Sequence, residues 1–153
     1  MVLAGCGGGG SGTKTSEQEK AVAARWANGL HAWGKGMNHV IDGISILFSQ
    51  PADVRGIQAG SHRVGLLLTR YEQTLAACSS RVHRLGAAPA SLELARKEAL
   101  HACISLERAA RLIRNGVREF QRGLGPDVLN STSDPLSAGQ DGVRRALLDT
   151  SQG

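Results

Sequence analysis

The chain has 153 residues and a formal net charge of +5 at pH 7, and 41% of its residues are hydrophobic. This length needs no second domain and suffices for one buried core. Aromatic residues make up only 3% of the chain, and strand-favouring residues are scarce, so the composition favours an all-helical fold over a sheet. The most apolar stretch, at 37–48, is interrupted by His39 and Asp42. It falls short of the roughly 18 apolar residues that cross a bilayer, so we expect no transmembrane segment.

Residues 1–15 combine a cysteine motif with a glycine-rich segment. Small residues precede the cysteine in Leu3-Ala4-Gly5-Cys6, and GGGGSG follows it. The motif resembles the lipobox of bacterial lipoproteins. The preference for Arg over Lys resembles that of high-GC bacteria, in which small uncharacterised helical lipoproteins are common. The resemblance implies that Cys6 is lipidated, for example with palmitate, and that a disordered, flexible arm tethers the protein to the membrane.

The motif lies close to the start of the numbered chain. A signal peptide has a basic segment and an apolar segment of about 7 to 15 residues before its cleavage site, whereas only Met1 to Gly5 precede Cys6. The lipoprotein interpretation therefore expects a start codon upstream that supplies the signal peptide. In the alternative interpretation, Cys6 is an incidental residue of a disordered arm.

Three long helices are predicted within residues 16–124. Ser16 with Glu19 forms a capping-box pattern at the start of the first helix. Pro51 suits the first position of the second helix, and Gly86 ends it. The predicted helices span about 16–49, 52–85 and 91–123.

Similar helix lengths and short connections favour antiparallel neighbours, so the sequence predicts an up-down-up three-helix bundle. Pro126 prevents continuation of the third helix. The tail at 125–153 is polar, with one short amphipathic helix expected near 139–150 that docks on the bundle or frays.

Apolar residues recur in each predicted helix at alternating spacings of four and three, which is the heptad spacing of packed helices. These residues are Trp26, Leu30, Trp33, Met37, Val40, Ile44 and Leu47 in the first helix, Val64, Leu68, Tyr71, Leu75, Cys78, Val82 and Leu85 in the second, and Ala99, Cys103, Leu106, Ala110, Ile113, Val117, Phe120 and Leu124 in the third. Facing residues of an antiparallel pair have a constant sum of residue numbers. The predicted layers are therefore Trp26/Leu75/Leu106, Leu30/Tyr71/Ala110, Trp33/Leu68/Ile113, Met37/Val64/Val117, Val40/Ser61/Phe120 and Ile44/Ile57/Leu124.

The same register places Cys78 opposite Cys103. Facing cysteines in an oxidising compartment form a disulfide, and the lipoprotein interpretation supplies that compartment. On the loop-entropy model this bond contributes on the order of 3 kcal/mol to stability. The alternative is two buried free thiols in a cytosolic bundle.

Glycines recur at heptad spacing in the first predicted helix, at Gly29, Gly36 and Gly43, and Gly56 and Gly60 open the second. Each interior glycine costs a helix about 0.5 to 1 kcal/mol relative to alanine. We expect these small residues to permit close packing within the bundle, and a binding groove is the alternative.

Two histidines and an aspartate are candidate metal ligands. The register places His39 beside His62, with Asp42 one turn along, which is a donor set that suits zinc. Both His39 and Asp42 point away from the predicted core, however, so solvated side chains are the preferred interpretation. No cofactor is predicted.

Four arginines follow helical spacing in the third predicted helix: Arg111, Arg114, Arg118 and Arg122. This basic stripe could contact an anionic surface such as lipid, an acidic partner or a phosphate backbone. Glu107 and Glu119 lie among these residues and exposed aromatic residues are not evident, so nucleic-acid binding is disfavoured. A solvated face is the simplest interpretation.

Catalytic patterns are absent or not identifiable from residue spacing. We therefore expect a non-enzymatic, membrane-tethered helical module on the extracytoplasmic face of the cell envelope. It would act through an unknown protein or envelope partner. The alternative is a soluble cytosolic helical binding protein for metal or nucleic acid.

Overall fold

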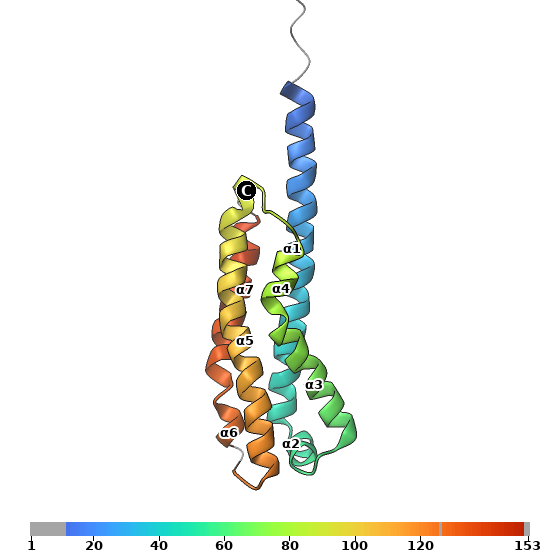
Figure 1. Cartoon of the computed structure of the whole chain (residues 1–153), viewed down its shortest axis with the longest axis vertical. Coiled ribbons are helices and arrows are strands. Elements are labelled where there is room, and N and C mark those ends of the chain that lie inside the picture. The colour runs from blue at the N-terminus through green and yellow to red at the C-terminus, as the bar shows by residue number, and fades with distance from the viewer. Residues whose placement is uncertain (1–11, 126, 152–153) are drawn as a thin grey trace, which may run out of the picture.

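The computed structural model describes residues 12–125 and 127–151. Within these ranges the chain is helical and contains no β-strand, as the composition predicts. The helices are α1 (Gly12–Ser49), α2 (Pro51–Gln58), α3 (His62–Ala76), α4 (Cys78–His83), α5 (Glu93–Gln121), α6 (Asp127–Asn130) and α7 (Ser133–Asp149), with a 3-10 turn at Ala90–Leu92 before α5 (Figure 1).

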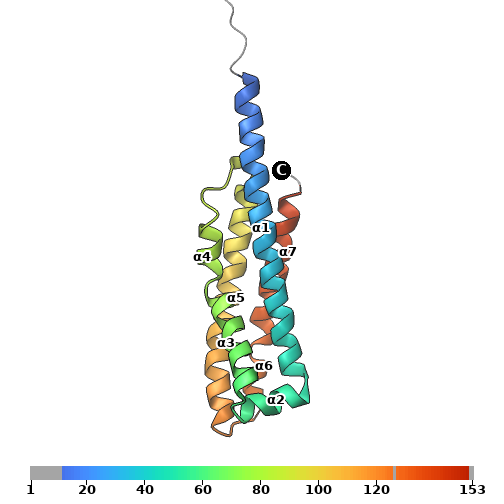
Figure 2. The same cartoon turned by 90° about the vertical axis from the view of Figure 1, so that its right-hand side faces the viewer.

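The described helices form an antiparallel bundle with four members: α1, α3 continued by α4, α5, and α7 (Figures 1 and 2). The expected bundle had three members and a short helix near 139–150. Instead α7 begins at Ser133 and packs along both α5 and α1. Because the bundle has four passes, α7 ends at the same end of the bundle from which α1 projects.

The early start of α7 is explained by the position of its proline. Pro135 lies in the first turn of α7. Backbone N–H groups in that turn have no partner within the helix, so the N–H group that proline lacks costs the helix little. Gly139 and Gly142 then bring α7 close to α5, because a Cβ built on Gly142 would lie 2.7 Å from the Cβ of Ala102.

The first helix begins at Gly12, before the predicted start at residue 16. The Ser16 and Glu19 pair therefore lies inside α1 and does not cap its start. Residues 16–22 are exposed, and Trp26 is the first buried residue after them. The N-terminal part of α1 projects beyond the other helices (Figures 1 and 2). The lipobox-like motif, including Cys6, and most of the expected tether lie outside the described residues.

The predicted second helix at 52–85 is divided into α2, α3 and α4. Gly60 has a φ of +68°, a left-handed conformation that suits glycine, and it ends the α2 segment. A second interruption falls at Ala77, between α3 and α4. The short α2 crosses the end of the bundle before α3 turns back along it (Figure 2).

The predicted pairing of Cys78 with Cys103 is confirmed, whereas the register predicted for the first helix is wrong. Tyr71 lies against Gly43 and not opposite Leu30, since a Cβ on Gly43 would lie 2.5 Å from the Tyr71 ring. Likewise Trp26 does not face Leu75: its indole N–H donates to the carbonyl of Gly86 at 3.4 Å. The crossing segment α2 explains the shift, because α3 starts at His62 and not directly after Pro51.

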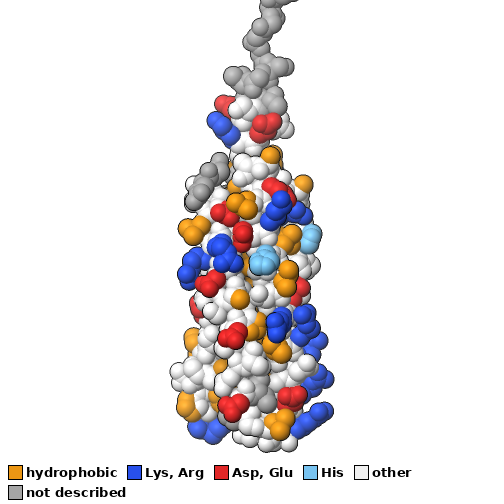
Figure 3. Space-filling view, turned by 90° about the vertical axis from the view of Figure 1, so that its left-hand side faces the viewer, with side chains coloured by type: hydrophobic (Ala, Val, Ile, Leu, Met, Phe, Trp, Pro, Cys, Tyr) orange, Lys and Arg blue, Asp and Glu red, His pale blue; other side chains and the backbone are white. Residues whose placement is uncertain are grey.

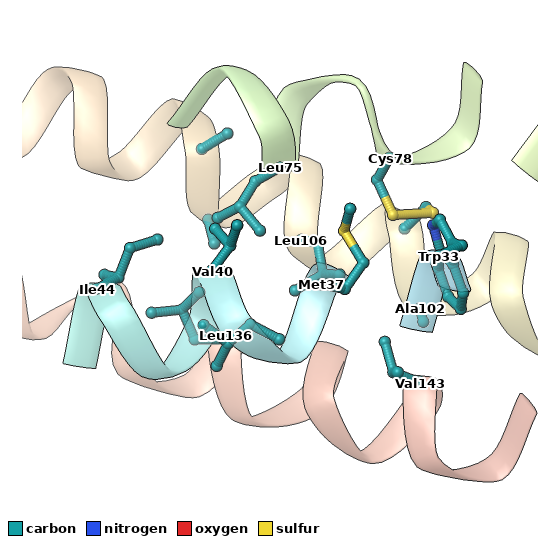
Figure 4. Close-up of a cluster of buried hydrophobic side chains, with 14 of the residues drawn as sticks. Trp33, Met37, Val40, Ile44, Leu75, Cys78, Ala102, Leu106, Leu136 and Val143 are labelled. Atoms are coloured by element: carbon teal, nitrogen blue, oxygen red, sulfur yellow. A yellow bond between two sulfur atoms is a disulfide. The ribbon is translucent and has the colours of Figure 1, made fainter. Parts of the chain in front are cut away.

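The core is continuous and draws on all four members of the bundle. Leu30, Met37, Ile44, Leu75, Leu106, Ile113 and Val143 are among the most buried side chains, and Figure 4 shows part of this cluster. Leu124 was expected in the last layer but is 52% exposed, because Gly123 has a φ of +98° just after α5 ends. Every helix of the described chain is too short or too polar to cross a lipid bilayer.

Candidate functional site

The predicted disulfide is present. The sulfurs of Cys78 and Cys103 lie at bonding distance, and their Cα atoms are 5.3 Å apart. Both residues are buried, and Trp33 of α1 lies beside the bond (Figure 4). The bond joins the first residue of α4 to the middle of α5, so it fixes the register of these two helices.

A carboxylate from α5 supports the start of α4. Glu107 Oε1 accepts a hydrogen bond from the backbone N–H of Ser79 at 3.0 Å and another from the Ser79 hydroxyl. Free N–H groups in the first turn of a helix favour a negative charge. Glu107 therefore caps α4 from a neighbouring helix, directly beside the disulfide.

The three candidate metal ligands that the sequence offered are not brought together. His39 packs edge-on against the Tyr71 ring, with ring centroids 6.4 Å apart, and both His39 and Asp42 are exposed. His62 begins α3 and lines a different hollow, next to Gly60 and Gln121. No group of three or more metal-ligating side chains occurs among the described residues.

One arginine of the predicted stripe has a structural role, and the other three are exposed. The Arg114 guanidinium pairs with Glu72 of α3, with Nε 3.0 Å from Glu72 Oε1. Glu72 is only 9% exposed, so Arg114 neutralises a largely buried carboxylate. The side chains of Arg111, Arg118 and Arg122 are exposed on α5.

The exposed basic face extends beyond the four arginines of the predicted stripe. Lys97 and Arg108 are exposed on the same side of α5 as Arg111, and two exposed aliphatic residues, Leu94 and Ile104, accompany them. Counting back from Arg111, a step of three residues reaches Arg108, and a further step of four residues reaches Ile104. The sequence therefore contained the signal, but only the structure shows that both side chains are outside the core. Figure 3 shows Lys and Arg side chains gathered along one edge of the lower half of the molecule.

A hollow of about 840 Å³ lies between the start of α1 and the loop before α5. Its walls include Val22 and Ala23 on one side and Ala87 to Ser91 on the other. Its charged lining residues are Glu19 and Lys20, and both are exposed. The hollow therefore offers no arrangement that points to a particular reaction.

The sequence matches no protein-family model, and comparisons with curated proteins and with solved structures found no similar protein. The structure itself defines the class: a helical bundle with one buried disulfide.

Proposed function

We propose that this protein is a lipid-anchored, extracytoplasmic helical module that acts through protein or cell-envelope contacts and not by catalysis. The buried Cys78–Cys103 bond carries the proposal. Structural disulfides form and persist in oxidising compartments and are rare in the cytosol of most bacteria. Of the three cysteines in the chain, the two in the bundle are thus paired, and Cys6 remains for acylation within its lipobox-like motif.

The engagement of three acidic side chains within the bundle supports the non-enzymatic part of the proposal. Glu72 pairs with Arg114, Glu107 caps α4, and Glu98 accepts from Arg145 Nε at 3.2 Å. Each of these carboxylates joins two helices of the bundle. Such groups hold the fold together and are poorly placed to exchange protons with a substrate.

The anchor can be tested by metabolic labelling. The protein, expressed from its own locus, is labelled with an alkyne analogue of palmitate, and the membrane fraction is analysed. We expect labelled protein in the membrane fraction, and we expect Cys6→Ser to abolish the label. The matched control is the double variant Cys78→Ala with Cys103→Ala, which removes the disulfide and should retain the label on any protein that accumulates.

The compartment is tested by a second measurement on the same cells. Rapid acid quenching followed by thiol alkylation should leave Cys78 and Cys103 unmodified until a reductant is added. An unlabelled protein whose two bundle cysteines alkylate without reduction would contradict the proposal and favour a cytosolic protein.

A further inference from the structure

The solvent-facing side of α5 carries one straight row of residues, which we call the α5 outer stripe. It consists of Lys97, His101, Ile104, Arg108, Arg111, Asn115, Arg118 and Arg122, all of which are exposed. These residues are spaced alternately by four and three, so they follow one face of the helix. From Lys97 to Arg122 the stripe is about 37 Å long, at about 1.5 Å per residue.

The stripe is the face of α5 that the bundle leaves uncovered. The buried residues of α5, among them Ala99, Leu106 and Ile113, lie on the opposite side of the helix. Helix α7 and the α3–α4 pair cover that buried side. The outer stripe therefore has no partner within the described chain.

The stripe is almost purely cationic because the acidic residues of α5 are engaged at its flanks or its start. Glu98 is held by Arg145 of α7, and Glu107 by Ser79 of α4. Glu93, at the start of the helix, pairs with Arg96. Only Glu119, at one edge, is an exposed carboxylate beside the stripe with no ion pair to a described residue.

Four of the five Lys and Arg side chains, those of Lys97, Arg108, Arg111 and Arg122, make no hydrogen bond or ion pair with another described residue. Arg118 contacts only a neutral group, the Asn115 side chain, at 2.6 Å. Five cations in one row face solvent without an ion pair to a described residue. This arrangement has the charge pattern of a surface that meets a negative partner.

Two aliphatic side chains accompany these cations. Ile104, within the stripe, is 65% exposed, and Leu94, at its upper end, is 59% exposed. They are the most exposed large hydrophobic side chains of the described residues. An aliphatic residue flanked by Lys and Arg is typical of helices that lie in the interface of a bilayer, where cations meet headgroups and the aliphatic side chain enters the acyl boundary.

We propose that the α5 outer stripe rests on the surface of an anionic phospholipid bilayer, with the bundle lying parallel to it. The inference deepens the proposed function, since a lipid-anchored protein has the membrane within reach. A straight, convex helix face fits a flat, deformable surface, and it offers no pocket for the side chains of a protein partner.

The proposal is tested with the full chain carrying Cys6→Ser, so that acylation plays no part. The protein is sedimented with vesicles of phosphatidylcholine alone, or of phosphatidylcholine containing phosphatidylglycerol. We expect binding only to the phosphatidylglycerol vesicles, weakening as salt rises. The triple variant Arg108→Gln, Arg111→Gln and Arg118→Gln should lower the vesicle partition coefficient on the order of a hundredfold, since each basic residue near the surface contributes about a factor of five.

The matched control removes the same charge elsewhere. Arg25→Gln, Arg63→Gln and Arg70→Gln alter three exposed arginines on α1 and α3 that have no ion pair with a described residue. This variant should keep most of the binding, and Ile104→Ser, with all charges intact, should lower it several-fold. Circular dichroism checks that each variant remains helical.

Two results would overturn the proposal. One is an absence of binding to phosphatidylglycerol vesicles, as expected if the stripe serves an acidic protein. The other is an equal loss of binding in the two triple variants, which would show that binding depends on net charge and not on the α5 outer stripe. Neither result bears on acylation of Cys6, and a failure of the labelling experiment leaves the vesicle measurement intact, so the two proposals fail separately.

Discussion

At the scale of single residues, Arg114 differs from the other arginines on its helix. The sequence presents Arg111, Arg114, Arg118 and Arg122 as one basic row, but Arg114 lies toward α3 and neutralises Glu72. Removing one partner of such a pair leaves the other charge desolvated without compensation, and this costs more than the pair itself contributes. Arg114 is therefore a structural residue, and its neighbours are surface residues.

We predict that Arg114→Gln lowers the free energy of unfolding by about 1 to 2 kcal/mol, because the Glu72 carboxylate then lacks its cation. Arg111→Gln removes the same charge from an exposed position and should change stability by less than about 0.5 kcal/mol. Urea titrations followed by circular dichroism measure both values. Equal midpoints for the two variants would show that the ion pair contributes nothing.

The sequence did contain enough to place Cys78 opposite Cys103, because both belong to heptads that extend over several turns on each side. It did not contain enough to separate Arg114 from Arg111. The two differ by less than one turn of helix, and the choice depends on where Glu72 lies across the interface. A register derived from apolar positions fixes the levels of residues along the axis but not the side to which a long polar side chain turns.

At the scale of elements, the contact between α5 and α7 depends on the absence of side chains. A Cβ on Gly139 would lie 2.3 Å from Leu106 Cδ2, and one on Gly142 would lie 3.0 Å from the Cα of Ala102. The second of these neighbours is backbone and cannot move aside. The two helices therefore approach as closely as they do because α7 has glycine at both positions.

We expect Gly142→Ala to destabilise the protein by about 1 to 3 kcal/mol, because the added methyl group overpacks the interface. Gly36→Ala is the matched control. Gly36 lies within α1, and a Cβ there would meet nothing within 4 Å, so the substitution should stabilise the protein by about 0.5 to 1 kcal/mol through helix propensity. Thermal and urea unfolding of both variants show whether each substitution raises or lowers the free energy of unfolding. Stabilisation by Gly142→Ala would show that α7 packs elsewhere.

The helix ends illustrate which element boundaries a sequence can reveal. Ser49 and Pro51 mark a true boundary, and Gly86 and Gly123 end helices with φ values of +81° and +98°. Gly60 carries the same signal, although the predicted second helix at 52–85 runs through it. The extra segment α2 displaced α3 relative to α1, so one missed turn shifted the register between those helices from the predicted one.

At the scale of the whole molecule, the core depends on the fourth member of the bundle, α7. Leu136, Val143 and Ala146 of α7 are buried, and they cover the side of α5 that carries Ala102 and Leu106. The sequence predicts too short a helix in the tail, because Pro135, Gly139 and Gly142 are poor helix formers by intrinsic propensity. Tertiary packing outweighs that propensity here.

A chain ending at Gly125 should therefore lose its cooperative unfolding transition and bind a hydrophobic dye such as ANS, because its core is open along α1 and α5. The control is Leu148→Ser in the full chain. It alters the most exposed large hydrophobic residue of α7, 56% exposed, and should leave the transition midpoint almost unchanged. A sharp transition in the shortened protein would support the three-member bundle.

The even number of passes in the bundle has a practical consequence for reporters. Because Thr150, directly after α7, has its Oγ1 2.9 Å from Nε2 of His31 in the middle of α1, an epitope placed after α7 would lie toward the end from which α1 projects. The turns at Gly60 and Gly123 lie at the other extremity (Figure 1). An epitope inserted at the Gly60 turn would therefore lie at the end opposite to the one from which α1 projects.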